Sequence, residues 1–134
     1  MPGDEAIVAE IAGESALDKA DATALLADDR VIFLVGFDGD AAVGFVFAHE
    51  LRRRRGDPAQ LFIYDVDVAE THRRQGIGKA LLREVAEVAR GRGIRTGFVL
   101  TNESNEAAMA LYRSAGGVRP AGDDVLWDFE YAGG

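Results

Sequence analysis

The stretch of residues 61–101 constrains the fold most, because a strand pattern, a helix pattern and a second strand pattern follow one another there. Its central part, residues 77–90, has apolar side chains at positions 77, 81, 82, 85, 88 and 89, which is the spacing of an amphipathic helix with one buried face. Two strands joined through such a helix pair in parallel by a right-handed crossover. The stretch therefore predicts an α/β fold in which the helix packs against a sheet.

Further elements flank this unit on both sides. Residues 31–51 indicate two strands around a turn at residues 38–40, which predicts antiparallel pairing and hence a mixed sheet. Residues 105–116 favour a second helix, and the alternating run VLWDFEY, residues 125–131, predicts a last strand. Residues 14–27 have apolar side chains close to helical spacing, which predicts a helix before the first strand.

Length and composition narrow the class of protein. A chain of 134 residues with 48% hydrophobic and 28% charged residues is expected to form one globular domain, residues 1–134. It has no cysteine, so it has no thiolate nucleophile and no cysteine-based metal site, and no metal is expected. The sequence lacks an apolar run that would span a bilayer and begins with acids instead of a basic signal region, which favours a cytoplasmic protein without a membrane partner. Its net charge of −8 argues against a nucleic-acid partner and is compatible with a cationic substrate.

The run HRRQGIGKALL, residues 72–82, joins the strand to the helix through Gly76 and Gly78. The first turn of a helix has unpaired N–H groups and the positive end of the helix dipole, so it favours an anion. Glycines there would let a phosphate approach the amides closely. The run lacks the lysine–serine or lysine–threonine ending of a P-loop, and Leu81 stands where the dinucleotide fingerprint needs a third glycine.

The loop instead has the pattern R-x-x-G-x-G, residues 73–78, and so resembles the pyrophosphate loop of the GNAT acyltransferase superfamily, which binds acetyl-coenzyme A. Val68 lies five residues before Arg73, where the superfamily has the last apolar residue of its central strand. The run NEAAMALYRSAG, residues 105–116, resembles its second motif. The resemblance implies a mixed, centrally splayed sheet flanked by helices, with a shortened N-terminal segment, because only about 30 residues precede Val31. Related enzymes often associate, which implies a homodimer.

The resemblance also implies the residues that bind acetyl-coenzyme A. Backbone groups of Val66, Asp67 and Val68 would pair with the pantetheine arm, and an N–H group there would stabilise the tetrahedral intermediate. The loop and the second motif supply the other cofactor-binding residues: Arg73, Arg74, Gln75, Gly76, Ile77, Gly78, Lys79, Asn105 and Tyr112. Direct attack of an amine on the thioester in a ternary complex needs no covalent enzyme intermediate.

Two acids of the strand, Asp65 and Asp67, are expected to lie on one face together with Leu61 and Ile63. Carboxylates this close raise the pKa of at least one of them, which suits a general base that deprotonates the acceptor amine. The alternative is that both acids only face solvent. Tyr112 resembles the family tyrosine that protonates the departing thiolate, and its alternative is a core aromatic residue.

A narrower resemblance concerns IYDVDVAETHRRQGI, residues 63–77, which is similar to a stretch of the aminoglycoside 3-N-acetyltransferases. There the aspartate matching Asp65 lies at the acceptor site, and we expect Asp67, Glu103 and Glu106 to complete an acidic acceptor pocket. The favoured activity is acetyl transfer from acetyl-coenzyme A to a primary amine of an aminoglycoside or similar polycationic small molecule, as in antibiotic resistance. A protein lysine or N-terminal acetyltransferase is one alternative, and a non-catalytic acyl-coenzyme A-binding module is another.

Two further features stay open at this stage. His72 is read as a solvated or supporting residue beside the loop, with a general base as the alternative. The four arginines at residues 52–55 form either a solvated loop or a contact for the 3′-phosphate of the coenzyme.

Overall fold

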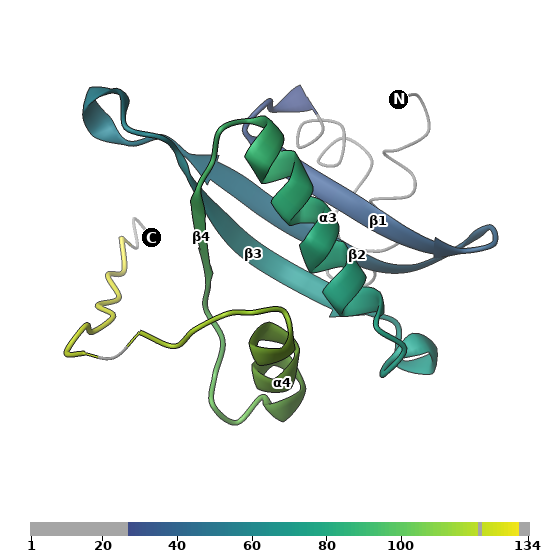
Figure 1. The fold of residues 1–134 in the computed structure, drawn as a ribbon. Helices are drawn as coiled ribbons and strands as arrows, with labels where there is room; N and C mark the ends of the chain where they lie inside the picture. The colour runs from purple at the N-terminus through teal and green to yellow at the C-terminus, as the bar shows by residue number, and fades with distance from the viewer. Residues whose placement is uncertain (1–26, 121, 132–134) are drawn as a thin grey trace.

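A computed structural model of the protein describes residues 27–120 and 122–131, and the predicted helix at residues 14–27 lies almost entirely outside these residues. Within the described part, one four-stranded sheet has the order β1-β2-β3-β4 (Figure 1). Its strands are β1 (Val31–Asp38), β2 (Ala41–Leu51), β3 (Gln60–Val68) and β4 (Thr96–Val99). The first three strands pair antiparallel and β4 pairs parallel with β3, so the predicted mixed sheet is confirmed.

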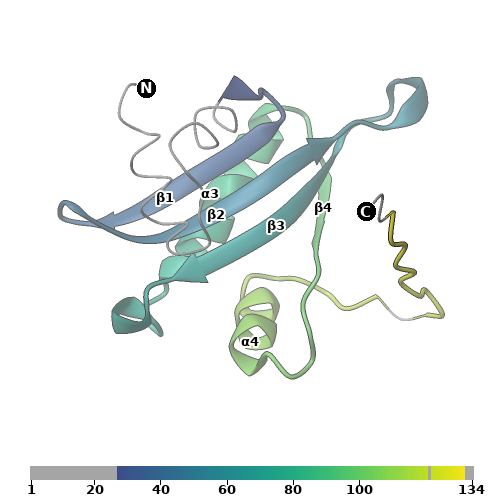
Figure 2. The same ribbon diagram turned by 180° about the vertical axis from the view of Figure 1, so that it is seen from behind.

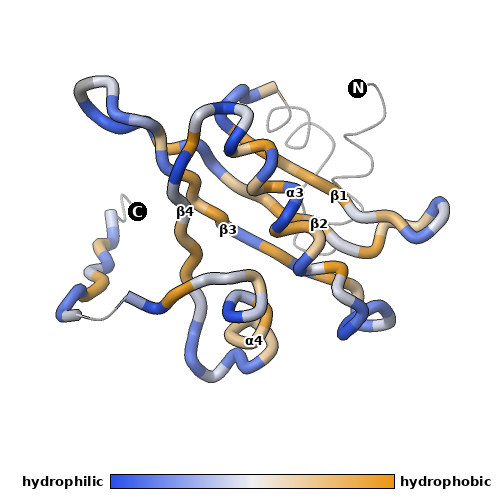
Figure 3. The backbone as a smooth tube through the Cα atoms, viewed as in Figure 1, coloured by the Kyte–Doolittle hydropathy of each residue, from blue (hydrophilic) through white to orange (hydrophobic). Residues whose placement is uncertain are grey.

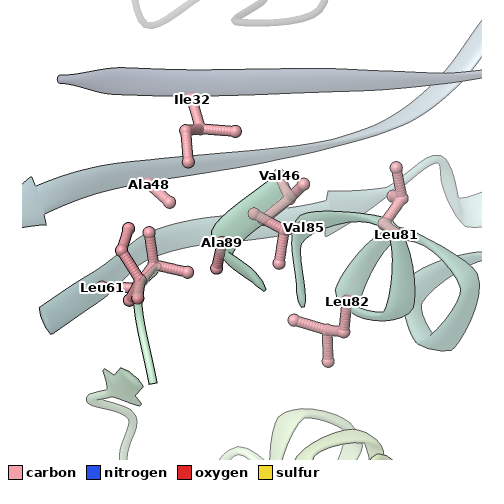
Figure 4. Close-up of a cluster of buried hydrophobic side chains, with 9 residues drawn as sticks. Ile32, Val46, Ala48, Leu61, Leu81, Leu82, Val85 and Ala89 are labelled. Carbon is pink, nitrogen blue, oxygen red and sulfur yellow. The ribbon is translucent and has the colours of Figure 1, made fainter. Parts of the chain in front are cut away.

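Helix α3 (Ile77–Gly91) covers one face of this sheet and confirms the amphipathic helix predicted for residues 77–90 (Figures 1 and 4). The side chains that the helix buries follow its apolar stripe, and they pack on residues from β1, β2 and β3, with Leu81, Leu82, Val85 and Ala89 against Ile32, Val46, Ala48 and Leu61. Val46 and Val85 are almost fully buried at the centre. Because this stripe contacts three strands at once, the position of α3 on the sheet is well determined.

Shorter elements connect and extend this core. The 3-10 turn η2 (Arg54–Gly56) joins β2 to β3, and η3 (Glu70–His72) follows β3. Helix α4 (Glu106–Ser114) begins after Asn105, whose side-chain oxygen accepts a hydrogen bond from the amide of Ala108 at 3.0 Å, as expected for an N-cap. In the part of the chain described here, no helix is both long and apolar enough to cross a bilayer.

The sheet opens between β3 and β4. Their parallel pairing runs from Gln60 opposite Thr96 to Ile63 opposite Val99 and stops there, whereas β3 continues to Val68. Beyond Ile63, β3 and the segment that follows β4 diverge, and α4 lies below the opening (Figures 1 and 2). The predicted central splay is therefore present, and it leaves one edge of β3 without a strand partner among the described residues.

The prediction of a last strand at residues 125–131 was wrong. This segment joins no strand of the described sheet and runs apart from it (Figures 1 and 3). Its apolar side chains are largely exposed, at 72% for Val125, 75% for Trp127, 70% for Phe129 and 89% for Tyr131. Alternating polarity indicates a segment with two faces, but a strand also needs a partner for its backbone, and local sequence does not supply one.

Candidate active site

The loop between β3 and α3 presents unpaired backbone amides. Gly76 has a φ of 82° and Arg74 has a φ of 64°, so both lie in the left-handed region and turn the chain sharply into the helix. The first helical hydrogen bond runs from the amide of Ala80 to the carbonyl of Gly76 at 2.9 Å. Within the described part of the chain, the amides of residues 74–79 donate no hydrogen bond, and this is the arrangement that binds an anion.

The two glycines of the loop are needed for different reasons. No atom lies within 4 Å of the position that a Cβ atom of Gly76 would take, so its positive φ is what requires glycine there. A Cβ atom on Gly78 would instead lie 3.1 Å from the side chain of Leu111 on α4. Close packing of α3 on α4 is therefore a further reason for glycine at position 78, in addition to the expected space for a phosphate.

A cleft of about 960 Å³ joins this loop to the end of β3 and to α4. Most of the predicted cofactor-binding residues line it, namely Val66, Asp67, Val68, Arg73, Arg74, Gly76, Ile77, Gly78, Lys79, Asn105 and Tyr112. Gln75 is exposed and does not line the cleft. Sequence reasoning missed the wall that the small residues Ala107, Ala108 and Ala110 of α4 contribute to the cleft.

Side chains fasten the loop to the sheet on both sides. The Arg73 Nε donates to the carbonyl oxygen of Val68 at 3.1 Å, and its Nη2 lies 3.8 Å from the Asp67 Oδ1. The His72 Nε2 lies 2.9 Å from the Asp38 Oδ2 at the turn between β1 and β2, while its Nδ1 lies 2.8 Å from the Thr71 Oγ1. His72 thus has a supporting position with both ring nitrogens engaged, as the supporting interpretation expects.

A β-bulge in β3 decides which way the two acids of this strand face. Ala48 of β2 pairs with Ile63 and the preceding Phe47 pairs with Asp65, so Tyr64 is an extra residue on β3. Before the bulge, Leu61 and Ile63 pack toward α3. After it the alternation is reversed, so Asp65 and Asp67 lie on the face opposite α3. The predicted common face of these four residues was therefore wrong, because one inserted residue exchanges the faces.

The bulge has an energetic consequence. In a regular strand, Asp65 and Asp67 would follow Leu61 and Ile63 into the apolar layer beneath α3, where an unpaired carboxylate is strongly unfavourable. Instead, both side chains are exposed at the opening of the sheet, and Val66 takes the inward position against the core.

The surroundings of Asp65 and Tyr112 raise the pKa of both groups. Partial burial raises the pKa of Asp65, the negative charge of Asp67 raises it further, and the neighbouring amide of Val66 opposes both effects. Burial also raises the pKa of Tyr112, and the negative charge of Asp65 adds to that shift. Tyr112 lines the cleft, whereas Asp65 lies outside its lining and acts on the phenol through its charge.

The other predicted acids are more dispersed. Glu106 lines the cleft at the start of α4, and Glu103 forms an exposed ion pair with Arg119 at 2.5 Å. Among the residues that the structure describes, no group of His, Asp and Glu side chains is arranged to hold a metal ion. The arginines at residues 52–55 precede the start of β3, whereas the loop follows its end, and a strand of nine residues spans roughly 30 Å. The 3′-phosphate contact considered for these arginines therefore has no support.

A splayed sheet with unpaired helix N-terminal amides at its open end is the arrangement of an acyltransferase-like domain. The sequence profile described as the acetyltransferase (GNAT) family matches residues 6–116, and the chain belongs to this family. It is 33% identical over 99 residues to N-acetyltransferase 8F1 of Rattus norvegicus, which covers 74% of this chain and 45% of that protein. It is 36% identical over 90 residues to streptothricin acetyltransferase of Streptomyces lavendulae, covering 67% of this chain and 45% of that protein.

The chain thus spans somewhat less than half the length of these relatives. Among solved structures, an aminoglycoside acetyltransferase from an uncultured soil metagenomic sample has the same fold at a TM-score of 0.79 and 29% identity. That similarity covers 96% of this chain and 90% of the other.

The conformation of the loop is tested by substitutions at Gly76. We expect Gly76→Val to lower the free energy of unfolding by about 1–2 kcal/mol, because a β-branched residue is strained at positive φ. Gly76→Asn should lower it by clearly less, since asparagine tolerates this region. Urea denaturation measures both effects. The control is Gly91→Val at the end of α3, which has an ordinary φ and open space. Equal stability of Gly76→Val and the wild type would contradict the left-handed backbone conformation assigned to Gly76.

Proposed function

We propose that the protein transfers an acetyl group from acetyl-coenzyme A to a primary amine of an aminoglycoside or a similar polycationic small molecule. One observation carries this proposal: a single cleft leads from the unpaired amides at the start of α3 to Tyr112 on α4, and the negative charge of Asp65 acts on this tyrosine. Unpaired amides at one end of the cleft and Tyr112 at the other match a donor with a pyrophosphate at one end and a thioester at the other.

The donor would bind along the free edge of β3. Its pyrophosphate would accept hydrogen bonds from the loop amides, with Arg74 and Lys79 beside them. The amide of Ala69 donates to Val43 of β2 at 2.7 Å, so by strand alternation the backbone groups of Val66 and Val68 point toward the opening. The Val68 N–H group already donates a hydrogen bond to the Asp67 side chain, and the Val68 carbonyl oxygen accepts one from the Arg73 side chain. This leaves Val66 as the backbone partner for the pantetheine arm and the thioester.

Acetyl transfer then follows from the positions of three groups. Asp65 accepts a proton from the ammonium of the acceptor, and its raised pKa makes it a better base. The amine attacks the thioester carbon, and the N–H group of Val66 stabilises the negative charge on the carbonyl oxygen. As the C–N bond replaces the C–S bond, Tyr112 protonates the departing thiolate. Tyrosine holds its proton at neutral pH, and burial, which raises the pKa of Tyr112, keeps it protonated before the thiolate forms.

The choice of acceptor is supported by charge and by similarity. The chain has a net charge of −8, and Asp65 and Asp67 stand together at the opening. Two similar proteins, the streptothricin acetyltransferase and the aminoglycoside acetyltransferase, are named for small-molecule acceptors, which favours this class over a protein substrate. The resemblance of residues 63–77 to the 3-N-acetyltransferases supports the 3-amino group as the one acetylated. We place this reaction in the cytoplasm.

The activity is tested by thiol release from acetyl-coenzyme A with aminoglycosides, polyamines and lysine peptides as acceptors. We expect the fastest release with aminoglycosides. A preference for peptides would favour the protein acetyltransferase alternative. Binding of coenzyme A without release for any amine would favour the non-catalytic alternative.

Charge reversal checks the donor assignment within the same experiment. Lys79→Glu should raise the KM for acetyl-coenzyme A about tenfold, because it replaces attraction of the pyrophosphate by repulsion. Arg52→Glu makes the same charge change at the other end of β3 and should leave this KM within about twofold. Equal KM values for the two variants would remove the loop from donor binding.

The role of Asp65 is visible in the pH dependence of kcat/KM. Because the carboxylate must be unprotonated to act as a base, kcat/KM of the wild type should fall as the pH decreases through the raised pKa of Asp65. Asp65→Asn should lower kcat by about 10²-fold, abolish this acid limb and leave coenzyme A affinity unchanged. Tyr112→Phe should slow the reaction but keep the acid limb. An acid limb that persists in Asp65→Asn would exclude Asp65 as the base.

We also infer that the protein forms a homodimer. β4 is an edge strand of the described sheet; Phe98 within it is 36% exposed and Leu100, just after it, is 60% exposed. An apolar cavity of about 340 Å³ lies next to this strand, beneath α3. The exposed segment at residues 125–131 has the alternating pattern of a strand without a partner. Pairing of this segment with β4 of a second copy would give both backbones a strand partner and would cover their exposed apolar side chains.

Sedimentation velocity tests the dimer. The wild type should sediment as a dimer at micromolar concentration, and Trp127→Asp combined with Phe129→Asp should produce monomers, because the segment loses its apolar side. Phe37→Asp, at an apolar position that is 51% exposed at the opposite edge of the sheet, should leave the dimer intact. A monomeric wild type would overturn this inference.

A further inference from the structure

The bulge in β3 brings two consecutive side chains to the same face of the sheet. In a regular strand neighbouring residues point to opposite faces. Tyr64 is the inserted residue, and its ring contacts Phe47, which is the residue that pairs with Asp65. The ring of Tyr64 and the carboxylate of Asp65 therefore face solvent on the same side of the sheet, and the Cα atoms of the two residues are about 3.8 Å apart.

The Tyr64 ring is held in place although it is exposed. It packs in edge-to-face contacts on Phe47, Phe62 and His49, with ring centroids 5.8, 5.6 and 6.1 Å away and interplanar angles of 82°, 77° and 86°. Even so, 63% of the residue is accessible to solvent. These contacts restrict the ring before any ligand arrives, so a ligand that stacks on it loses little binding energy to ordering.

The charges around the ring favour a cation. The face of an aromatic ring carries partial negative charge and attracts ammonium groups. Asp65 forms no ion pair with another residue of the described chain, whereas Arg73 lies near Asp67. A cation next to Tyr64 thus meets the ring face and the carboxylate of Asp65 at the same time.

We propose that Tyr64 is a specificity-determining residue of the acceptor site and selects amines carried on a saturated ring. The C–H groups on one side of such a ring lie on the Tyr64 face, one ammonium substituent lies over the ring, and the reacting amine reaches Asp65. A linear polyamine covers the tyrosine with only one methylene or ammonium group at a time. This inference rests on the proposed function and narrows its acceptor class to cyclic polyamines, the amino-sugar and aminocyclitol type.

The test compares neamine, a cyclic polyamine, with spermidine, a linear one, at saturating acetyl-coenzyme A. Tyr64→Leu should raise the KM for neamine about fivefold to tenfold, with kcat changed by less than about twofold, because the contact serves ground-state binding. The KM for spermidine should change by less than about twofold. Tyr64→Phe keeps the aromatic ring, so its KM for neamine should stay at the wild-type value. Phe37→Leu removes an aromatic ring that is 51% exposed on β1, at the opposite edge of the sheet, and it should change neither KM.

Several results would overturn the proposal: an unchanged KM for neamine in Tyr64→Leu, an equal loss in Tyr64→Phe, or an equal loss for spermidine. Calorimetric titration with neamine in the presence of coenzyme A separates this inference from the proposed function, because it needs no turnover. If neamine binding weakens in Tyr64→Leu but the wild type transfers no acetyl group, the role of Tyr64 in amine binding would be supported and the proposed acetyltransferase activity would be refuted. Absence of neamine binding to the wild type would refute the proposed role of Tyr64 in amine binding.

Discussion

The packing of α3 on the sheet is the interaction on which the rest of this structure depends. Val85 on the helix and Val46 on β2 are buried at its centre, so apolar burial holds the helix against three strands. That contact places the first turn of α3 directly after the end of β3. It also holds Gly78 against Leu111, which brings α4 to the opposite side of the cleft. An anion site made of backbone amides needs this rigidity, because the amides contribute only when they all point to one place.

The opening between β3 and β4 and the bulge at Tyr64 complete the site. The opening leaves the backbone of Val66 without a strand partner in the described sheet, and the bulge turns Asp65 and Asp67 away from the apolar layer. Both features weaken the sheet locally, since they remove ladder hydrogen bonds. In return, the carboxylate of Asp65 lies near Tyr112, and the ring of Tyr64 stands beside it. Irregular backbone thus occurs where the proposed chemistry needs it.

Local patterns predicted the regular elements well. The apolar spacing of residues 77–90 gave α3, the turn at residues 38–40 gave the hairpin, and Asn105 is the N-cap of α4. These features depend on interactions within a few residues of the chain. The facing of Asp65 and the predicted strand at residues 125–131 were wrong, because a bulge and a strand partner depend on segments that are distant in sequence.

By itself, the sequence determined the helix faces, the strand order along the chain and the glycine-rich loop, since each follows from short-range geometry and side-chain type. It also contained the residues of the cofactor cleft, most of which the loop pattern identified. Only the tertiary structure decided that Gly78 serves helix packing, that Tyr64 and Asp65 share a face, and that Asp65 lies close enough to Tyr112 to raise its pKa. The physical reason is that register, packing and electrostatic coupling arise between segments that meet only when the chain folds.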